Sequence, residues 1–166
     1  MLAVPHGDGI FSAANTVARR APIVVASRDW HPSDHISFRS RGGIWLPHCQ
    51  QGTDGAEFHP ALDRSLVQEV FSKGSDPDRE AYSAFDGTDL AGWLRERGVR
   101  RLLVAGLATD YCVRASVLDA LGAGFDVTVL RDGIGAVDVK PGDGDRALEE
   151  MREAGARVVD STELSG

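Results

Sequence analysis

The chain has 166 residues and a mass of 17.8 kDa, which is the size of a single domain. Its net charge of −7 and its arginines, scattered among acidic residues, argue against a nucleic-acid partner. No segment approaches the ~18 consecutive apolar residues of a membrane span, and the N-terminus lacks the basic and apolar regions of a signal peptide. We therefore expect no membrane partner and a cytoplasmic location.

The first half of the chain predicts one helix, two short strands and a long loop. Residues 10–20 have the spacing of an amphipathic helix, and residues 22–27 form the short apolar run of a strand buried on both faces. Residues 28–63 have no periodicity and are rich in Gly, Pro, His and Asp, and loops of this length are usually functional or disordered. A short strand is predicted around residues 67–71.

The second half alternates helices and strands more tightly. Helices are predicted at residues 90–97, 110–121 and 145–153, and strands at residues 101–106, 127–130 and 157–159. Such alternation is typical of an α/β fold with a parallel, doubly wound sheet and helices on both faces. Ligands of these folds bind beyond the carboxyl ends of the strands, and both cysteines and most histidines fall in loops.

Three histidines and one aspartate cluster in the long loop. Asp29 and His31 flank a single residue just past the first strand, so their side chains share a face of an extended chain. His35 and His48 follow in the same loop. One carboxylate with two or three imidazoles suits zinc, iron or manganese, and an open coordination position would bind substrate or water. The cluster therefore predicts a divalent metal site without distinguishing among these metals.

The second candidate site surrounds Cys112. This residue follows a buried strand and lies in the first turn of a predicted helix, where the helix dipole and free N–H groups favour a thiolate and can hold an oxyanion. A nucleophilic thiol also needs a neighbour that removes its proton or balances its charge, and Lys73 is placed to reach the same end of the sheet. The alternative is that Cys112 and Cys49 fill the core and that Lys73 is a solvated surface residue.

Several separate motifs, in order along most of the chain, resemble the nicotinamidases within the isochorismatase-like cysteine hydrolases. The motifs are LAVPHGD, DWHPSDHISF, WLPHCQQGTDGAEFHP, VFSKG, a long segment from AYSAFDGTDL through VAGLATDYCVRASVLDAL, and ALEEMREAGARVVDS. The resemblance implies one isochorismatase-like domain over residues 1–166, with a parallel Rossmann-like sheet flanked by helices. It also implies deamidation of nicotinamide, a small-molecule substrate, to nicotinate and ammonia.

The resemblance assigns catalytic roles around the thiol. Cys112 matches the family's nucleophile, and Lys73 matches the cation that lowers the pKa of that thiol and steadies charge in the transition state. The backbone N–H groups of Ala108 and Cys112 match the oxyanion hole. In the family a cis peptide bond shapes this hole, and here that bond would join Leu107 to Ala108.

The resemblance also assigns the metal and substrate positions. Four residues match metal-binding positions of the family: Asp29, His31, His48 and His35. The last of these matches a position that is a direct ligand in some members and supports the ligands in others. The open position of the metal resembles the seat of the pyridine nitrogen, with Trp45 and Tyr82 as aromatic walls around the ring. The thiolate would then attack the amide carbon, ammonia would leave, and water would hydrolyse the thioester.

The sequence departs from the family pattern at its N-terminus. Family members carry an apolar first strand that ends in a catalytic aspartate before the LAVPHGD region, and this sequence begins inside that region. Asp8 matches a later position and does not replace it. We therefore expect the first strand to be missing, so that residues 23–26 and 102–105 lack a shared neighbour. Loss of the aspartate would cost ~10² to 10⁴ in rate. A start assigned too far downstream at Met1 would explain the difference.

Other interpretations stay open. The chain could be a different cysteine amidohydrolase of the superfamily, although the sister groups generally lack the metal cluster. It could instead be an inactive binder of metal and pyridine-type ligands, or a non-functional fragment with the spectroscopic properties of a molten state. The sequence leaves open whether the protein forms a homo-oligomer. It also leaves open whether Cys49, next to His48, approaches Cys112 closely enough for a disulfide.

Overall fold

The computed structural model describes residues 4–164, and its strands form two parallel sheets. In the first sheet β1 (Val25–Asp29) pairs with β2 (Glu69–Lys73). In the second sheet β4 (Asp126–Gly135) lies between β3 (Arg101–Leu107) and β5 (Arg157–Val159). The predicted α/β class, with parallel strands flanked by helices, is confirmed. A single continuous sheet does not form within the described residues, because none of their strands joins β1 to β3.

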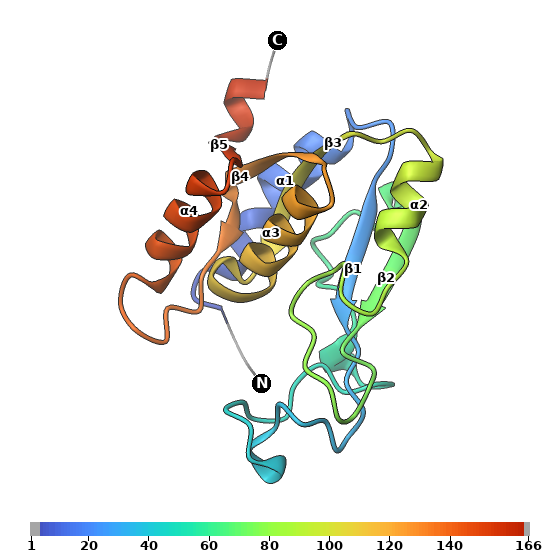
Figure 1. Ribbon diagram of the computed structural model, residues 1–166, viewed down its shortest axis with the longest axis vertical. Coiled ribbons are helices and arrows are strands. Elements are labelled where there is room, and N and C mark those ends of the chain that lie inside the picture. The colour runs from blue at the N-terminus through green and yellow to red at the C-terminus, as the bar shows by residue number, and fades with distance from the viewer. Residues whose placement is uncertain (1–3, 165–166) are drawn as a thin grey trace.

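Four α-helices surround these sheets: α1 (Ile10–Ala18), α2 (Leu90–Glu96), α3 (Arg114–Gly122) and α4 (Asp143–Glu153). Figure 1 shows α3 and α4 over one face of the three-stranded sheet, α1 behind it, and α2 beside β1 and β2. Within residues 4–164, no helix combines the length and the apolar character that a membrane crossing requires.

The main apolar core lies between α2, α3, α4 and β4. Val117 on α3, Val129 on β4 and Met151 on α4 are completely buried in it. Val25 and Phe71 of the two-stranded sheet pack against the same core, and the Phe71 ring meets Trp93 of α2 edge-on at 6.0 Å between centroids. The short helix α2 therefore connects the two sheets through apolar packing.

The segment predicted as one helix over residues 110–121 begins differently. A π-helix, Thr109–Val113, precedes α3. The Ala108 carbonyl accepts the N–H groups of both Tyr111 and Val113, which widens this first turn. Single π-turns of this kind often occur at functional sites, and this one contains Cys112.

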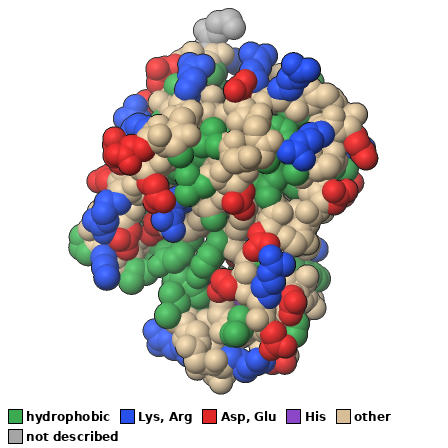
Figure 2. All heavy atoms as spheres, in the orientation of Figure 1, with side chains coloured by type: hydrophobic (Ala, Val, Ile, Leu, Met, Phe, Trp, Pro, Cys, Tyr) green, Lys and Arg blue, Asp and Glu red, His purple; other side chains and the backbone are tan. Residues whose placement is uncertain are grey.

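The long loop after β1 folds back on itself. His31 forms a parallel bridge with Gln50, and Phe38 forms another with Trp45. Phe38 is completely buried and anchors the fold of the loop. This part of the chain forms the lower end of the molecule in Figure 1, and Figure 2 shows hydrophobic side chains gathered in the hollow between it and the upper body.

Candidate active site

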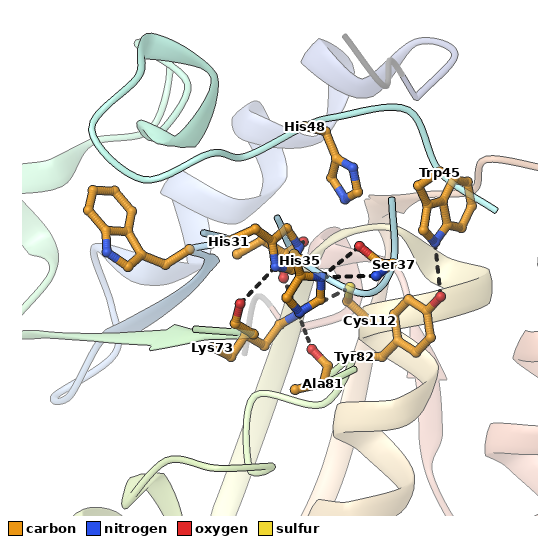
Figure 3. A network of polar contacts seen from close by, with 12 residues as sticks. His31, His35, Ser37, Trp45, His48, Lys73, Ala81, Tyr82 and Cys112 are labelled. Carbon is orange, nitrogen blue, oxygen red and sulfur yellow. Dashed lines mark hydrogen bonds and ion pairs between the residues drawn. The ribbon is translucent and has the colours of Figure 1, made fainter. Parts of the chain in front are cut away.

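Lys73 lies at the centre of the site, at the carboxyl end of β2. The parallel register places it opposite Asp29, the last residue of β1. Its side chain is 4% exposed, and its ammonium group donates three hydrogen bonds: a very short one to Asp29 Oδ1, one of 3.1 Å to the Ala81 carbonyl and one of 3.4 Å to Cys112 Sγ. All three donors of this buried cation are therefore satisfied, as burial of a charge requires (Figure 3). The structure thus brings Lys73 and Cys112 together and excludes a solvated surface role for this lysine.

The environment of Cys112 acts on its thiol in opposing directions. Burial raises the pKa of Cys112 to about 11, and the negative charge of Asp29 adds to the rise. The Lys73 ammonium group and a hydrogen bond from the Ala108 backbone favour the thiolate and oppose that rise. Lys73 responds reciprocally: burial disfavours its charge, but the neighbouring Cys112 and Asp29 more than offset this and raise its pKa. Lys73 therefore stays protonated as the counter-charge of the thiol.

The backbone next to the thiol has the predicted geometry. The peptide bond between Leu107 and Ala108 is cis, as expected from the family resemblance. Ala108 is buried and immediately precedes the π-helix that contains Cys112. Its backbone hydrogen bond to the thiol places an N–H donor beside the sulfur, where an oxyanion hole would be useful.

Asp29, His31 and His48 form a group that can hold a metal ion. One ligand atom from each residue lies within 4.8 Å of the others. His31 Nδ1 donates to the Gly74 carbonyl at 2.8 Å, and His48 Nδ1 contacts the Leu46 carbonyl at the same distance, which leaves both Nε2 atoms available. Backbone carbonyls commonly orient metal-binding histidines in this way. The donor set therefore fits a divalent metal of the zinc, iron or manganese type.

Two features prepare His31 for this role. Burial lowers its pKa, which favours the neutral imidazole that a metal requires. Gly74 has a φ of 62°, and a Cβ on it would lie 2.5 Å from His31 Cε1, so only glycine allows this close approach. His31 Nε2 lies 4.0 Å from Asp29 Oδ2, whereas Asp29 Oδ1 faces Lys73. Asp29 therefore contacts the metal group through one oxygen and the lysine through the other.

The structure places His35 outside the group of ligand atoms. Its Nδ1 lies 2.7 Å from Ser37 Oγ, and its Nε2 donates to the Arg79 carbonyl at 3.0 Å, so both ring nitrogens are engaged. The ring is completely buried and stacks on His31 with 4.1 Å between centroids. In this arrangement both ring nitrogens of His35 are occupied by other partners, and its ring packs against His31.

Aromatic side chains lie beside the metal group and the thiol. Trp45 Nε1 donates to the Tyr82 hydroxyl at 2.9 Å, which joins the two predicted walls of the ring site. Tyr111 meets Trp45 edge-on at 4.9 Å and tilts against Tyr82 at 5.5 Å. Sequence reasoning missed Tyr111, although its position directly before Cys112 was an available indication.

Both cysteines are free. Cys49 is partly buried beside the metal group, and its carbonyl accepts the N–H of His31 at 2.9 Å. Burial raises the pKa of Cys49 to about 11, and the negative charges of Asp29 and Cys112 add to this while Lys73 opposes it. Of the two cysteines, only Cys112 has a hydrogen bond to Lys73 among the described contacts.

The structure thus combines a parallel α/β fold with a lysine-paired cysteine next to an Asp–His–His group. The isochorismatase domain model matches residues 2–163, and the chain belongs to this family. It is 41% identical to the nicotinamidase of Escherichia coli over 95% of this chain and 85% of that protein. The family resemblance predicted from the motifs is thereby confirmed.

Solved structures of nicotinamidases and pyrazinamidases are similar to this chain. A pyrazinamidase of Pyrococcus horikoshii in complex with zinc superposes with a TM-score of 0.88 and 50% identity, over 96% of this chain and 89% of that one. The yeast nicotinamidase bound to the inhibitor nicotinaldehyde superposes with a TM-score of 0.86 and 26% identity, over 96% of this chain and 91% of that one.

Proposed function

We propose that the protein is a metal-dependent cysteine amidohydrolase that converts nicotinamide and water to nicotinate and ammonia. The contact between Lys73 Nζ and Cys112 Sγ, 3.4 Å long and next to the Asp29, His31 and His48 group, carries the proposal. The similarity to nicotinamidases supports the choice of substrate.

In this proposal Lys73 and Ala108 prepare the nucleophile. The ammonium group of Lys73 stabilises the Cys112 thiolate, which attacks the amide carbon and forms a C–S bond. The backbone N–H groups of Ala108 and Cys112 hold the negative charge that develops on the amide oxygen. The thiol proton passes to solvent when the thiolate forms, and the leaving nitrogen takes up a proton from solvent as the C–N bond breaks and ammonia departs. Water then hydrolyses the thioester to release nicotinate.

The other residues of the site orient the substrate. Asp29, His31 and His48 would hold a divalent ion, which would supply a Lewis acid for the pyridine nitrogen. Trp45 and Tyr82 would flank the ring and limit its rotation. Because Asp29 also pairs with Lys73, the position of the ring and the position of the attacking thiol depend on one carboxylate.

Ammonia release from nicotinamide by the purified 166-residue chain, supplied with zinc, iron or manganese, tests the proposal. We expect turnover in the unmodified protein and none with Cys112→Ala, while Cys49→Ala serves as the matched cysteine control. Benzamide is the substrate control, because it keeps the carboxamide but lacks the ring nitrogen, and we expect its turnover to be much slower. Binding of nicotinamide without any ammonia release would contradict the amidase proposal and favour an inactive binder.

A further inference from the structure

A buried carboxylate outside the metal group ties the Cys112 segment to the loop after β4. Asp110 lies in the π-helix, two residues before Cys112, and is 7% exposed. Its Oδ1 accepts the N–H of Val137 at 3.0 Å, and its Oδ2 accepts the N–H of Asp138 at 2.9 Å. Backbone donors therefore hold both oxygens, and the proposed reaction makes no use of this side chain.

The connection continues into α4. Asp138 has a φ of 52°, and its Oδ1 accepts the N–H of Gly144 in the first turn of α4 at 2.8 Å. Hydrogen bonds to a carboxylate are stronger than those between neutral groups. Two successive carboxylates thus link the π-helix, the loop after β4 and α4.

These links are important because Lys73 and Cys112, the two partners in the proposed chemistry, come from different sheets. Lys73 ends β2, whereas Cys112 follows β3, and no described strand joins the two sheets. The distance of 3.4 Å between Nζ and Sγ therefore depends on how firmly the π-helix is held on its own side. A displacement of ~1 Å in such a site can cost ~10²-fold in rate.

We propose that Asp110 is a positioning residue for the nucleophile. Its carboxylate fixes the π-helix against residues 137 and 138 so that the Cys112 thiol stays beside Lys73 and the Ala108 N–H. The kinetic consequence rests on the proposed amidase function, whereas the reactivity of the thiol towards an alkylating agent does not.

Asp110→Asn tests this role, because it keeps the size of the side chain but turns an NH₂ group towards one of the two backbone N–H donors. We expect kcat for nicotinamide to fall about 10- to 100-fold, with KM changed by less than about twofold. The rate of Cys112 alkylation by iodoacetamide, measured at pH 8 in a Cys49→Ser background, should fall at least about threefold, because a displaced thiol loses its cationic partner. Asp119→Asn, the same charge change on the exposed side of α3, is the control and should leave all three values unchanged.

A folded Asp110→Asn protein with the kcat and alkylation rate of the unmodified chain would overturn the proposal. So would a loss of kcat that only follows a loss of folded protein in circular dichroism, with Cys112 alkylation unchanged in the folded fraction. If Asp110→Asn does not fold, Asp110→Ser removes the carboxylate and its hydrogen bonds to the N–H groups of residues 137 and 138 while leaving a small polar side chain. We expect about threefold slower Cys112 alkylation from that variant, and an unchanged rate would overturn the proposal. Absence of turnover in the unmodified chain would refute the amidase function, and alkylation would still decide the role of Asp110.

Discussion

The two sheets of this protein carry the proposed active site in different ways. In the polar region, which comprises β1, β2 and the loop between them (residues 25–73), the buried groups include His31, His35 and Lys73 beside Phe38. In the apolar region, which comprises residues 101–159, the completely buried side chains include Val117, Val129 and Met151. The polar region supplies charges and ligands, and the apolar region supplies a firm platform for the thiol.

The two regions are stabilised by different kinds of interaction. Buried polar groups cost free energy unless each has a partner, so the polar region depends on its hydrogen bonds and on the ion pair between Asp29 and Lys73. Close packing of apolar side chains stabilises the apolar region, and its buried Asp110 carboxylate has hydrogen-bond partners as well. Removal of one polar partner should therefore disturb the chemistry of the site, whereas truncation of the core should reduce the free energy of unfolding.

The largest effect is expected at the point where the two regions meet. Cys112→Ala should lower nicotinamide turnover by about 10⁴-fold or more, because no other described thiol contacts Lys73. Metal content, measured by atomic absorption, should stay the same, because the ligands lie in the polar region. Residual turnover within tenfold of the unmodified protein would show that Cys112 is not the nucleophile.

The next largest effect distinguishes a proposed metal ligand, Asp29, from a residue proposed to orient the ligands, His35. Asp29→Asn should weaken zinc binding by more than about 100-fold, because it removes a ligand charge and the Lys73 partner together. His35→Ala should weaken it by only about tenfold, the range typical of groups that orient ligands. Chelator competition measures both, and equal losses would show that His35 binds the metal directly.

A matched pair of core truncations compares the packing of the two regions. Val129→Ala should lower the free energy of unfolding by about 2 to 3 kcal/mol, because it removes two buried carbons and leaves a cavity. Val70→Ala, on the half-exposed strand β2, should cost less than about 1 kcal/mol. Urea unfolding measures both, and equal costs would remove the distinction between the regions.

The smallest effect concerns alkaline pH. Folding raises the pKa of Cys112 from 9.0 to about 11, so the folded protein holds this proton more tightly than the unfolded chain. The resulting stability is fully present below pH 9.0 and is lost as the pH rises towards about 11. We expect the Tm to fall over this window and to fall less steeply in Cys112→Ala. Identical slopes in calorimetry would contradict the assigned shift.

Much of the fold could be predicted from the sequence because it depends on local patterns. Alternating apolar runs and helical spacings predicted the strands that became β1 to β5 and the helices α1 to α4, within a few residues at most boundaries. The largest deviations were the π-helix before α3 and the extension of β4 to Gly135, since neither changes the local apolar spacing. The motifs also indicated Cys112, Lys73 and the Asp29, His31 and His48 group.

Tertiary structure alone decided how these residues are partnered. The pairing of Asp29 with Lys73, the hydrogen bond from His35 Nε2 to the Arg79 carbonyl and the contact of Tyr111 with Trp45 all join residues far apart in the chain. The link from Asp110 to the loop after β4 has the same origin. Sequence periodicity reports which side of its own helix or strand a residue occupies. It does not report which distant backbone or side-chain group that residue contacts. At this site those contacts determine the charge of Lys73, the availability of the histidine nitrogens as ligands and the reactivity of the Cys112 thiol.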